Sequence, residues 1–536
     1  MVNSMKRFNT TGLCVPEKHY MVDITERLVQ IKAMVDAGYY FTINRGRQYG
    51  KTTTLSALRK YLIPEYEVIS LDFQGIGAAG FETEERFVQS FSRLIRKEKR
   101  RGIYIPDNVY DQFEEYINRK EHMARLDELF ETISDWCYES KKGLVLIIDE
   151  VDSATNNQVF LDFLAQLREN YLSRDDRGDP AFQSVILAGV TDIRNLKRKI
   201  RPDEAHKVNS PWNIAVEFNI DMSLSEDGIR GMLEDYESDH HTGMDTAAVA
   251  KEIREYTSGY PFLVSRICQL IDTDIAGKEE RFPTLSSAWT SEGISESVRM
   301  ILLDRNLLFD SLMGKVQNNA ELEKVLYQIL FTGDPIAYTP YDFAISDACM
   351  YGFIVNIDGK MRIANRIFET LLYNYFLSEE ELKKSSIALS GTDYRSDFIQ
   401  NGHLRMDKLL ERYITVFDDI YGDQNEPFDE AEGRRRFLLF LRPVINGTGN
   451  YYVEAQTRSS RRMDLVVDYL GERHVVELKI WRGAAYHEEG EKQLTDYLLS
   501  LHLTEGYLLT YSFNKEKKQG LSEKTVNGMK LVEAIV

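Results

Sequence analysis

The chain has 536 residues, which is too long for a single hydrophobic core, so we expect two to four domains. Hydrophobic residues make up 43% of the chain and charged residues 28%, which excludes a mainly disordered protein. No run approaches the roughly 18 apolar residues that cross a bilayer, and the N-terminus lacks the apolar core of a signal peptide, so we expect a cytoplasmic protein without membrane contact. The four cysteines show no CxxC spacing, which favours reduced thiols over a zinc site or disulfides.

The formal net charge of −19 is unevenly spread along the chain. From Arg395 to the end, 20 Lys and Arg stand against 23 Asp and Glu, a net charge of −3, which leaves −16 for the first 394 residues. Phosphate binding needs clustered cations, so this balance excludes a protein that coats nucleic acid non-specifically. Any contact with nucleic acid is therefore expected in the C-terminal part.

Residues 1–220 alternate short apolar runs with helical stretches, as a doubly wound parallel sheet requires. Continuous apolar runs bounded by polar residues are typical of strands that are buried on both faces. The runs expected to form strands are Tyr39–Asn44, Glu67–Phe73, Leu144–Ile148, Ser184–Val190 and Ala215–Ile220. The fold class predicted for this region is α/β.

A phosphate-binding loop follows the first of these runs. It is nearly a Walker A pattern, although Arg45 occupies the position of the first glycine. Backbone N–H groups beside the glycines would approach phosphate oxygens, Lys51 would neutralise their charge, and the Thr52 hydroxyl would bind Mg²⁺. We therefore predict an ATP and Mg²⁺ site in a P-loop NTPase domain. Its predicted binding residues are Gly46, Gly50, Lys51, Thr52 and Thr53.

Two carboxylates end the run Leu144–Ile148, as in a Walker B pattern. Asp149 would hold Mg²⁺ through water, and Glu150 would orient or deprotonate the attacking water. A later apolar run ends at Thr191, where such ATPases place a polar residue that senses the γ-phosphate. Thr191 and Arg194 are both candidates for this role, with a plain loop as the alternative.

The middle of the chain is predicted to be helical. Residues 221–275 are expected to form a lid, in which Gly259-Tyr260-Pro261 is either a lid signature of nucleotide-binding proteins or a turn that ends a helix. Residues 276–377 combine helices with a hairpin of Tyr351–Ile357 and Met361–Ala364, which suggests a winged-helix-like module. The charged stretch 378–396 is predicted to be a linker.

The C-terminal region, residues 397–536, mixes helices and strands. The expected helices are 427–441 and 487–501, and the expected strands are 450–456, 463–470, 473–480 and 506–512. Glu477 and Lys479 lie two apart in an apolar run and would project from one face of a strand, beside Asp464 at the start of the neighbouring strand. Two converging carboxylates repel each other unless a cation lies between them, and their oxygens suit Mg²⁺ or Mn²⁺.

Such a metal would lower the pKa of a bound water while Lys479 positions the nucleophile, which is chemistry for phosphodiester cleavage. Charges within a buried strand are costly unless they are paired or metal-bound, which favours this interpretation over a solvated strand face. Gln493 and Tyr497 share one helix face and would support the site, as would Glu454. Glu430 would add a further carboxylate, with Glu432 as the alternative. Six arginines are candidate phosphate ligands or surface charges: Arg434, Arg435, Arg436, Arg458, Arg461 and Arg462.

The chain resembles bacterial proteins in which an AAA-like ATPase domain is fused to a nuclease-superfamily domain of the PD-(D/E)xK kind. The resemblance covers nearly the whole sequence and is carried by the runs Phe8–Pro16, Asn44–Thr52, Tyr451–Thr457 and Val476–Trp481. It implies that Arg45 is usual in the Walker A loop of such proteins and that residues 397–536 have a restriction-endonuclease-like α/β fold. It also implies that the nuclease motif falls on Asp464, Glu477 and Lys479, with Met463 in place of the motif's proline. A role in mobile elements or phage defence is a further implication of the resemblance.

These patterns favour an ATP-regulated nuclease that acts on nucleic acid, with DNA as the expected partner. AAA-type ATPases often complete their sites with an arginine from a neighbouring subunit, which leaves a homo-oligomer open. The alternative is a switch protein in which ATP drives assembly while the nuclease-like domain only binds nucleic acid or protein. A motor without nuclease activity would leave Asp464, Glu477 and Lys479 without a role.

Overall fold

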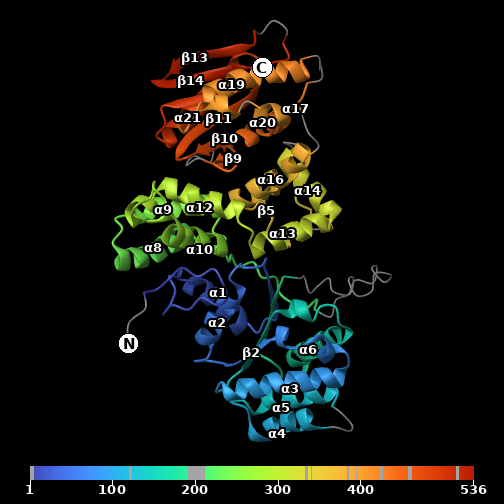
Figure 1. Ribbon diagram of the computed structural model, residues 1–536. Coiled ribbons are helices and arrows are strands. Elements are labelled where there is room, and N and C mark those ends of the chain that lie inside the picture. The colour runs from blue at the N-terminus through green and yellow to red at the C-terminus, as the bar shows by residue number, and fades with distance from the viewer. Residues whose placement is uncertain are drawn as a thin grey trace. The chain divides into compact units, whose positions relative to one another are not determined.

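The structure is a computed structural model, and it describes residues 5–119, 124–190, 212–331, 336–339, 341–382, 386–393, 395–422, 427–456, 462–514 and 518–536. The chain divides into two compact units, Met1–Ser223 and Leu224–Val536. Figure 1 shows both units and labels many of their helices and strands. None of the helices in these described ranges is long and apolar enough to cross a membrane.

The first unit is built around a parallel sheet whose strand order is β1-β4-β3-β2. Its strands are β1 (Phe41–Asn44), β2 (Glu67–Asp72), β3 (Leu144–Asp149) and β4 (Ser184–Gly189). Its helices are α1 (Thr25–Asp36), α2 (Lys51–Leu62), α3 (Glu84–Arg100), α4 (Asp107–Asn118), α5 (Leu126–Glu139) and α6 (Gln158–Arg177). The first four strand predictions and the α/β class of this unit are confirmed.

Alternate residues of the central strands enter two separate hydrophobic cores. Val145 and Ile147 of β3 pack with side chains of α1 and α2 on one face of the sheet. Leu146 and Ile148 pack on the other face, with side chains of α3, α5 and α6. Because both faces are covered, every residue from Leu144 to Ile148 is buried, which explains the continuous apolar run.

The fifth predicted strand, Ala215–Ile220, is wrong. Its backbone makes a single parallel bridge to β1, in which Val216 N donates to Tyr40 O at 2.8 Å. The Arg45 side chain donates to Ile220 O at 3.0 Å and so occupies a carbonyl that a ladder would use. The apolar side chains serve packing instead, since the rings of Phe218 and Phe41 stack with centroids 5.9 Å apart.

The second unit begins with helices and a hairpin. The helices are α8 (Glu226–His240), α9 (Thr246–Thr257), α10 (Pro261–Leu270), α11 (Leu285–Ala288), α12 (Ser291–Leu303), α13 (Leu307–Gln317), α14 (Ala320–Phe331), α15 (Phe343–Met350) and α16 (Arg366–Leu382). The predicted hairpin is confirmed as β5 (Ile354–Ile357) and β6 (Lys360–Ile363), which pair antiparallel. The two turn residues, Asp358 and Gly359, have φ angles of 51° and 79°, as a tight two-residue turn requires.

The described residues of the predicted linker 378–396, namely 378–382, 386–393 and 395–396, are helical. After α16, the helices α17 (Ser386–Asp393) and α18 (Arg395–Phe398) follow. Ile387 and Ala388 are buried, and a Cβ on Gly391 would lie 2.2 Å from Phe440 O. The short helix α17 therefore packs closely on α20, through a few small and apolar residues that show no sustained periodicity in the sequence.

The C-terminal part of the second unit is a mixed sheet of order β13-β14-β12-β11-β10-β9 with helices on both faces. Its strands are β9 (Gly449–Gln456), β10 (Arg462–Tyr469), β11 (Glu472–Ile480), β12 (Glu505–Tyr511), β13 (Gly520–Val526) and β14 (Met529–Ile535), and a small hairpin joins β7 (Ile399–Gln400) to β8 (His403–Leu404). Its helices are α19 (Met406–Tyr421), α20 (Glu430–Ile445) and α21 (Ala484–Ser500). The predicted elements of this region are confirmed, while α19, β13 and β14 were not predicted.

The helices α20 and α21 cover opposite faces of this sheet. A Cβ on Gly506 of β12 would meet Leu494 and Leu498 of α21, at 2.9 and 2.8 Å. Tyr511 lies five residues after Gly506 on the same strand and therefore points to the other face. Its hydroxyl donates to Gly433 O of α20 at 2.6 Å. Glu477 and Lys479 pair in register with Leu508 and Thr510 of β12, so they lie on the α21 face.

Candidate functional site

The predicted phosphate-binding loop lies at the carboxyl edge of the first sheet. It connects β1 to α2, and β4 separates β1 from β3, so the loop and the carboxylates after β3 end at the same edge of a parallel sheet. Gly50 has a φ of 80° and directly precedes Lys51, the first residue of α2. The left-handed turn at Gly50 aims the first N–H groups of α2 into the loop, which is the arrangement that binds phosphate at a helix N-terminus.

Lys51 is held inside this loop. Its Nζ donates to Arg45 O at 2.9 Å and to Gly46 O at 3.0 Å, and only 8% of the residue is exposed. Burial lowers the pKa of Lys51, while the carboxylates of Glu150 and Asp152 oppose that shift. The ammonium group is therefore in place to exchange two carbonyl contacts for phosphate oxygens.

Thr52 and Asp149 meet across the end of the sheet. The Thr52 hydroxyl donates to Asp149 Oδ2 at 2.9 Å, and Asp149 Oδ1 accepts from Glu150 N at 2.9 Å. Burial raises the pKa of Asp149, and the nearby Asp72 adds to the shift. Asp72 pairs in register with Asp149 at the end of β2. These oxygen donors fit Mg²⁺, which binds oxygen ligands and keeps much of its water.

Arg45, the departure from the usual loop sequence, serves the fold. Its guanidinium group donates to Asn44 O at 2.9 Å and to Ile220 O at 3.0 Å, and it lies 5.5 Å from the centroid of the Phe218 ring. Arg45 thereby ties the segment of Phe218 and Ile220 to the start of the loop. A glycine at this position could not make these contacts.

Asp152 was missed by the sequence reasoning. Its Oδ2 accepts from Val190 N at 2.7 Å, which ties the end of β4 to the turn after β3. The only available signal was its position three residues after Asp149. Glu150 itself has a φ of 54°, a left-handed conformation that is uncommon for a residue other than glycine. Thr53 Oγ1 accepts from Cys14 N at 3.3 Å.

Two other predictions on the nucleotide site have different outcomes. Thr191 and Arg194 lie outside the residues that the structure describes. Gly259 connects α9 to α10 with a φ of 72°, and its carbonyl accepts from Leu224 N at 2.8 Å. A Cβ there would lie 2.1 Å from Leu224 O, so only glycine fits this turn.

The predicted metal site lies on the strands β10 and β11. Their antiparallel register pairs Leu465 with Val476, so Asp464 and Glu477 fall opposite each other. Glu477 is only 1% exposed and its Oε1 lies 2.9 Å from Lys479 Nζ. Asp464 Oδ2 accepts from Leu478 N at 2.8 Å. The structure thus brings the three predicted residues together on one face of the sheet, with Glu477 buried and Asp464 and Lys479 partly buried.

The electrostatics of this set suit a divalent cation. Burial, followed by the charge of Asp464, raises the pKa of Glu477 to about 8, although Lys479 opposes the shift. Burial also raises the pKa of Asp464. Burial alone would lower the pKa of Lys479, but the carboxylates of Glu477 and Asp464 outweigh it and the net shift is upward. Glu477 Oε2 is buried without a hydrogen-bond partner among the described residues, which leaves an oxygen available for a metal ion.

Of the two further carboxylates considered, the structure places Glu430 near this set and not Glu432. Glu430 Oε1 accepts from the Tyr486 hydroxyl at 2.9 Å and lies 3.5 Å from Ile480 N, at the end of β11. Glu432 instead forms ion pairs of 2.6 Å with each of two candidate phosphate ligands, Arg435 and Arg436. Those two arginines are therefore already occupied by a carboxylate.

The structure describes only some of the remaining residues that were predicted to support the site. Arg434 is 6% exposed, and its charge lowers the pKa of Asp464 against the effect of burial. Tyr497 is buried in α21, and a Cβ on Gly490 of the same helix would lie 3.1 Å from Lys479 Cγ. Gln493 follows Gly490 by one turn. Only the backbone of Glu454 and Arg462 is described, with Glu454 in register opposite Asp464, and Arg458 and Arg461 lie outside the described residues.

Within the described residues, no three His, Cys, Asp or Glu side chains gather in the way of a ready-made metal cage. The site therefore offers a pair of facing carboxylates, Asp464 and Glu477. A pair is sufficient for Mg²⁺, which is commonly held by one or two carboxylates and several waters.

Several solved structures are similar to the chain. A Walker-type ATPase of Pyrococcus abyssi matches at 14% identity over 68% of this chain and 99% of that chain, with a TM-score of 0.44. The ORC2 protein of Aeropyrum pernix, solved with ADPNP and ADP, matches at 12% identity over 66% and 93%, with a TM-score of 0.33. The ORC1 protein of the same organism, solved in complex with DNA, matches at 13% identity over 66% and 93%, with a TM-score of 0.30. At these scores the likeness says nothing about function.

The family comparison covers more than half of the chain. The search of curated proteins found no match to the chain. A family model described as an AAA-like domain matches residues 18–369, a range that contains the phosphate-binding loop, the carboxylates after β3 and the helices α8–α15. The chain belongs to the family of AAA-like domains.

Proposed function

We propose that this protein is an ATP-regulated nuclease, in which the AAA-like region binds and hydrolyses ATP and the C-terminal sheet cleaves phosphodiester bonds with a divalent metal. The observation that carries the proposal is the convergence of Asp464, Glu477 and Lys479 on one face of β10 and β11, where Glu477 is buried and the other two side chains are partly buried. Burying a carboxylate costs several kcal/mol. Lys479 and the charge of Arg434 offset this cost only in part, since the pKa values of both Asp464 and Glu477 stay raised. Because these three charged residues cost the protein folding stability, a role in metal-dependent cleavage accounts for them best.

Asp464 and Glu477 would hold Mg²⁺ or Mn²⁺, and the unpartnered Oε2 of Glu477 supports this assignment. When bound, the metal would supply a water of lowered pKa and neutralise charge on the scissile phosphate. The hydrogen bond from Leu478 N to Asp464 Oδ2 fixes the orientation of that carboxylate. Preorganised ligands of this kind lose little entropy when the metal binds.

Lys479 would act as a cation and not as a base. The neighbouring carboxylates raise its pKa despite burial, so it stays protonated at neutral pH. Its ion pair with Glu477 holds the ammonium group beside the proposed metal ligands, at an Nζ to Oε1 distance of 2.9 Å. From there it would donate to the non-bridging oxygen of a phosphodiester and stabilise the charge that develops during cleavage.

In the AAA-like region, Lys51 and the N–H groups at the start of α2 would bind the phosphates of ATP. Thr52 and Asp149 would hold Mg²⁺, and Glu150 would orient the attacking water. The contact between Thr52 and Asp149 and the burial of Lys51 support these roles. Thr191 would complete the site as a sensor of the γ-phosphate.

A cleavage assay with full-length protein tests the proposal. Labelled single- and double-stranded DNA and RNA would be incubated with Mg²⁺ or Mn²⁺, with and without ATP. Glu477→Gln is expected to lose cleavage by at least about 100-fold, because it removes a carboxylate from the site. Glu472→Gln, on the same strand but 38% exposed, is the matched control and should retain activity. Intact ATP hydrolysis without metal-dependent cleavage of any substrate would contradict the proposal.

One observation favours a second function. Glu477 already pairs with Lys479 at 2.9 Å without a metal, which fits a switch protein, whose C-terminal sheet binds nucleic acid or a partner without cutting it. The same assay separates the two functions. A switch would keep its binding and its ATP hydrolysis in the Glu477→Gln variant, and would show no cleavage to lose.

A further inference from the structure

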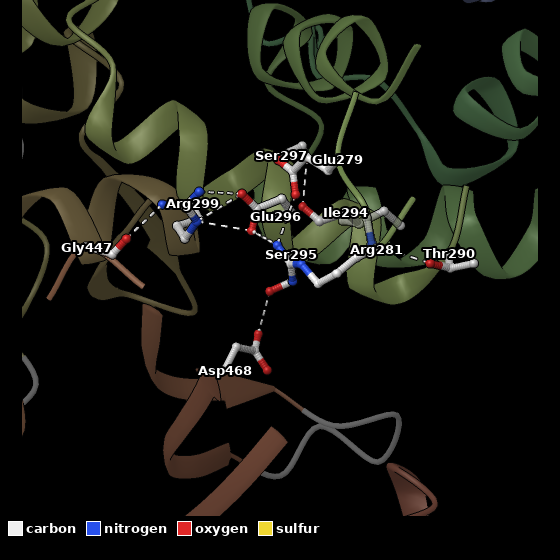
Figure 2. Close-up of polar contacts among 11 residues, drawn as sticks. Glu279, Arg281, Thr290, Ile294, Ser295, Glu296, Ser297, Arg299, Gly447 and Asp468 are labelled. Atoms are coloured by element: carbon white, nitrogen blue, oxygen red, sulfur yellow. Dashed lines mark hydrogen bonds and ion pairs between the residues drawn. The ribbon is translucent and has the colours of Figure 1, made fainter. Parts of the chain in front are cut away.

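A polar cluster around the buried Asp468 joins two helices of the AAA-like region to the C-terminal sheet, within the second unit. The Ser295 hydroxyl of α12 donates to Asp468 Oδ2 of β10 at 2.8 Å (Figure 2). Arg473 of β11 donates to Asp468 Oδ1 at 3.0 Å and to Ser291 Oγ at 3.2 Å. Ser291 in turn donates to Glu252 Oε1 of α9 at 2.6 Å. These five residues are called the docking cluster.

Contacts beside the docking cluster extend the junction. The rings of Tyr256 in α9 and Tyr452 in β9 pack edge to face, with centroids 5.0 Å apart. Arg299 of α12 donates to Gly447 O at 3.2 Å, and Figure 2 shows its guanidinium group held in place by Glu296. The helices α9 and α12 therefore contact three neighbouring strands or their ends, through both polar and aromatic groups.

The register of β10 and β11 relates the docking cluster to the proposed metal site. Asp468 pairs with Arg473, and two residues further along the strands Val466 pairs with Val475. The next pair on the same face is that of Asp464 and Glu477, because residues two apart on a strand share a face. At about 3.4 Å per residue, the docking pair lies about 14 Å from the proposed metal ligands. One apolar pair separates them.

The docking cluster resists separation of the helices from the strands. Asp468 is 6% exposed, and Arg473 is shared between Asp468 and Glu252. A shift of α12 would remove the Ser295 hydrogen bond from the buried Asp468 carboxylate, which is costly unless the strands follow. A shift of α9 would break the contacts of Glu252 with Ser291 and Arg473. Movement of the helices and movement of β10 and β11 are therefore linked.

The covalent path from the ATPase unit reaches the same helices. Leu224 follows Ser223, the last residue of the first unit, and its N–H binds the carbonyl of Gly259 at the end of α9. The helices α9 and α12 lie within the matched AAA-like range 18–369, whereas β10 and β11 lie outside it. The docking cluster thus joins two helices of the matched AAA-like range to the strands that carry the carboxylates.

We propose that the docking cluster is the coupling element of this protein, through which the nucleotide state of the AAA-like region repositions Asp464 and Glu477. The inference rests on the proposed function, since it names the contacts that would regulate that site. Ser295, Asp468 and Arg473 are positioning residues in this scheme. Coupling of this kind requires an element with two arrangements that both sites bias. In this proposal the docking cluster is that element, and a nucleotide-dependent change in the hydrogen exchange of β10 and β11 would reveal its second arrangement.

Hydrogen exchange of the full-length protein, with and without ATP, tests the inference without relying on cleavage. In the wild type, ATP should change the exchange of peptides from β10 and β11. The Ser291→Ala and Ser295→Ala double variant should lose this change while it keeps ATP hydrolysis. Ser297→Ala is the matched control, because its hydroxyl lies on the same helix but donates to Ile294 O and does not face the sheet.

The cleavage assay supplies the second readout. ATP should alter the wild-type rate by about fivefold or more and the rate of the double variant by less than about twofold, with the rate in the absence of ATP unchanged. A double variant that responds to ATP as the wild type does in both assays would overturn the inference. If exchange responds to ATP and the response depends on Ser291 and Ser295, but no substrate is cut, the coupling stands and the nuclease proposal fails.

Discussion

The affinity of the C-terminal site for Mn²⁺ should rise steeply with pH, because the metal binds the ionised form of Glu477. The pKa of Glu477 is raised to about 8 by burial and by Asp464, so a proton competes with the metal throughout the neutral range. The ionised fraction grows from about 1% near pH 6 to about one half near pH 8, so the affinity should increase about 50-fold, or about 2.3 kcal/mol. Asp464, whose pKa burial also raises, should steepen the dependence.

The sign of this effect distinguishes it from that of an ordinary ion pair. A carboxyl group whose pKa is raised by folding stabilises the folded state less and less as the pH rises from its unfolded value of about 4.5 to about 8. The metal-free protein should therefore lose stability over this range, and bound metal should restore it. A carboxyl group with a depressed pKa would show the opposite trend.

Titration calorimetry without nucleotide measures the affinity for Mn²⁺ and the number of protons released when it binds. In buffers of different ionisation enthalpy near pH 6, we expect release of about one proton for each Mn²⁺ bound. The measurement is best made in an Asp149→Asn background, which removes the other candidate metal ligand. Glu477→Gln should bind weakly and with little dependence on pH, and Glu472→Gln should behave as the wild type. A wild-type change of less than about threefold between pH 6 and 8, or an undiminished slope in Glu477→Gln, would refute the reasoning.

Three further predictions follow from the geometry. Lys51→Ala should weaken ATP binding by at least about 100-fold in a fluorescent-nucleotide titration, because it removes a buried charge-assisted contact to phosphate. Glu150→Gln should bind ATP normally but hydrolyse it at least about 100-fold more slowly, and normal hydrolysis would assign the attacking water to another residue. Gly391→Ala should lower the free energy of unfolding by about 1–3 kcal/mol, because its Cβ would lie 2.2 Å from Phe440 O. The control Gly314→Ala, at a helix position with open space, should raise it by up to about 1 kcal/mol, and equal effects in urea unfolding would show that α17 does not pack on α20.

Much of the first sheet could be predicted because its strands are buried on both faces. Leu144–Ile148 is apolar without interruption, and tertiary packing only confirms what this run requires. Ala215–Ile220 alternates apolar and polar residues, which is also typical of a strand, but the Arg45 side chain binds one of its carbonyls and the run makes one bridge only. The competing interaction joins residues that are 175 positions apart, which local pattern cannot reveal.

Other elements were missed for local reasons. The strand β13 consists largely of polar residues and is mostly exposed, so it lacks the apolar face by which a strand is recognised in a sequence. A usable signal was present nonetheless, because Asn527 and Gly528 form the turn between β13 and β14 with φ angles of 51° and 82°. The helix α17 is recognisable only from its contact with α20, since Ile387, Ala388 and Gly391 do not form a periodic pattern.

The functional residues also divide into those that local sequence patterns predict and those that depend on distant contacts. The convergence of Asp464, Glu477 and Lys479 follows from the two-residue repeat of strands and from the short connection between β10 and β11. The roles of Asp152 and of the docking cluster depend on contacts between distant segments, such as Ser295 with Asp468. Residues that position a site from a distance are therefore visible only in three dimensions.

The most direct test of the account is the single-turnover rate of metal-dependent cleavage of a labelled nucleic acid by the full-length protein, with and without ATP, in the wild type and in Glu477→Gln. We predict that the wild type cleaves in the presence of Mg²⁺ or Mn²⁺, that ATP changes its rate, and that Glu477→Gln does not cleave under any of these conditions. Equal cleavage by Glu477→Gln and the wild type would contradict the assignment of the site, and no cleavage by either would contradict the proposed activity.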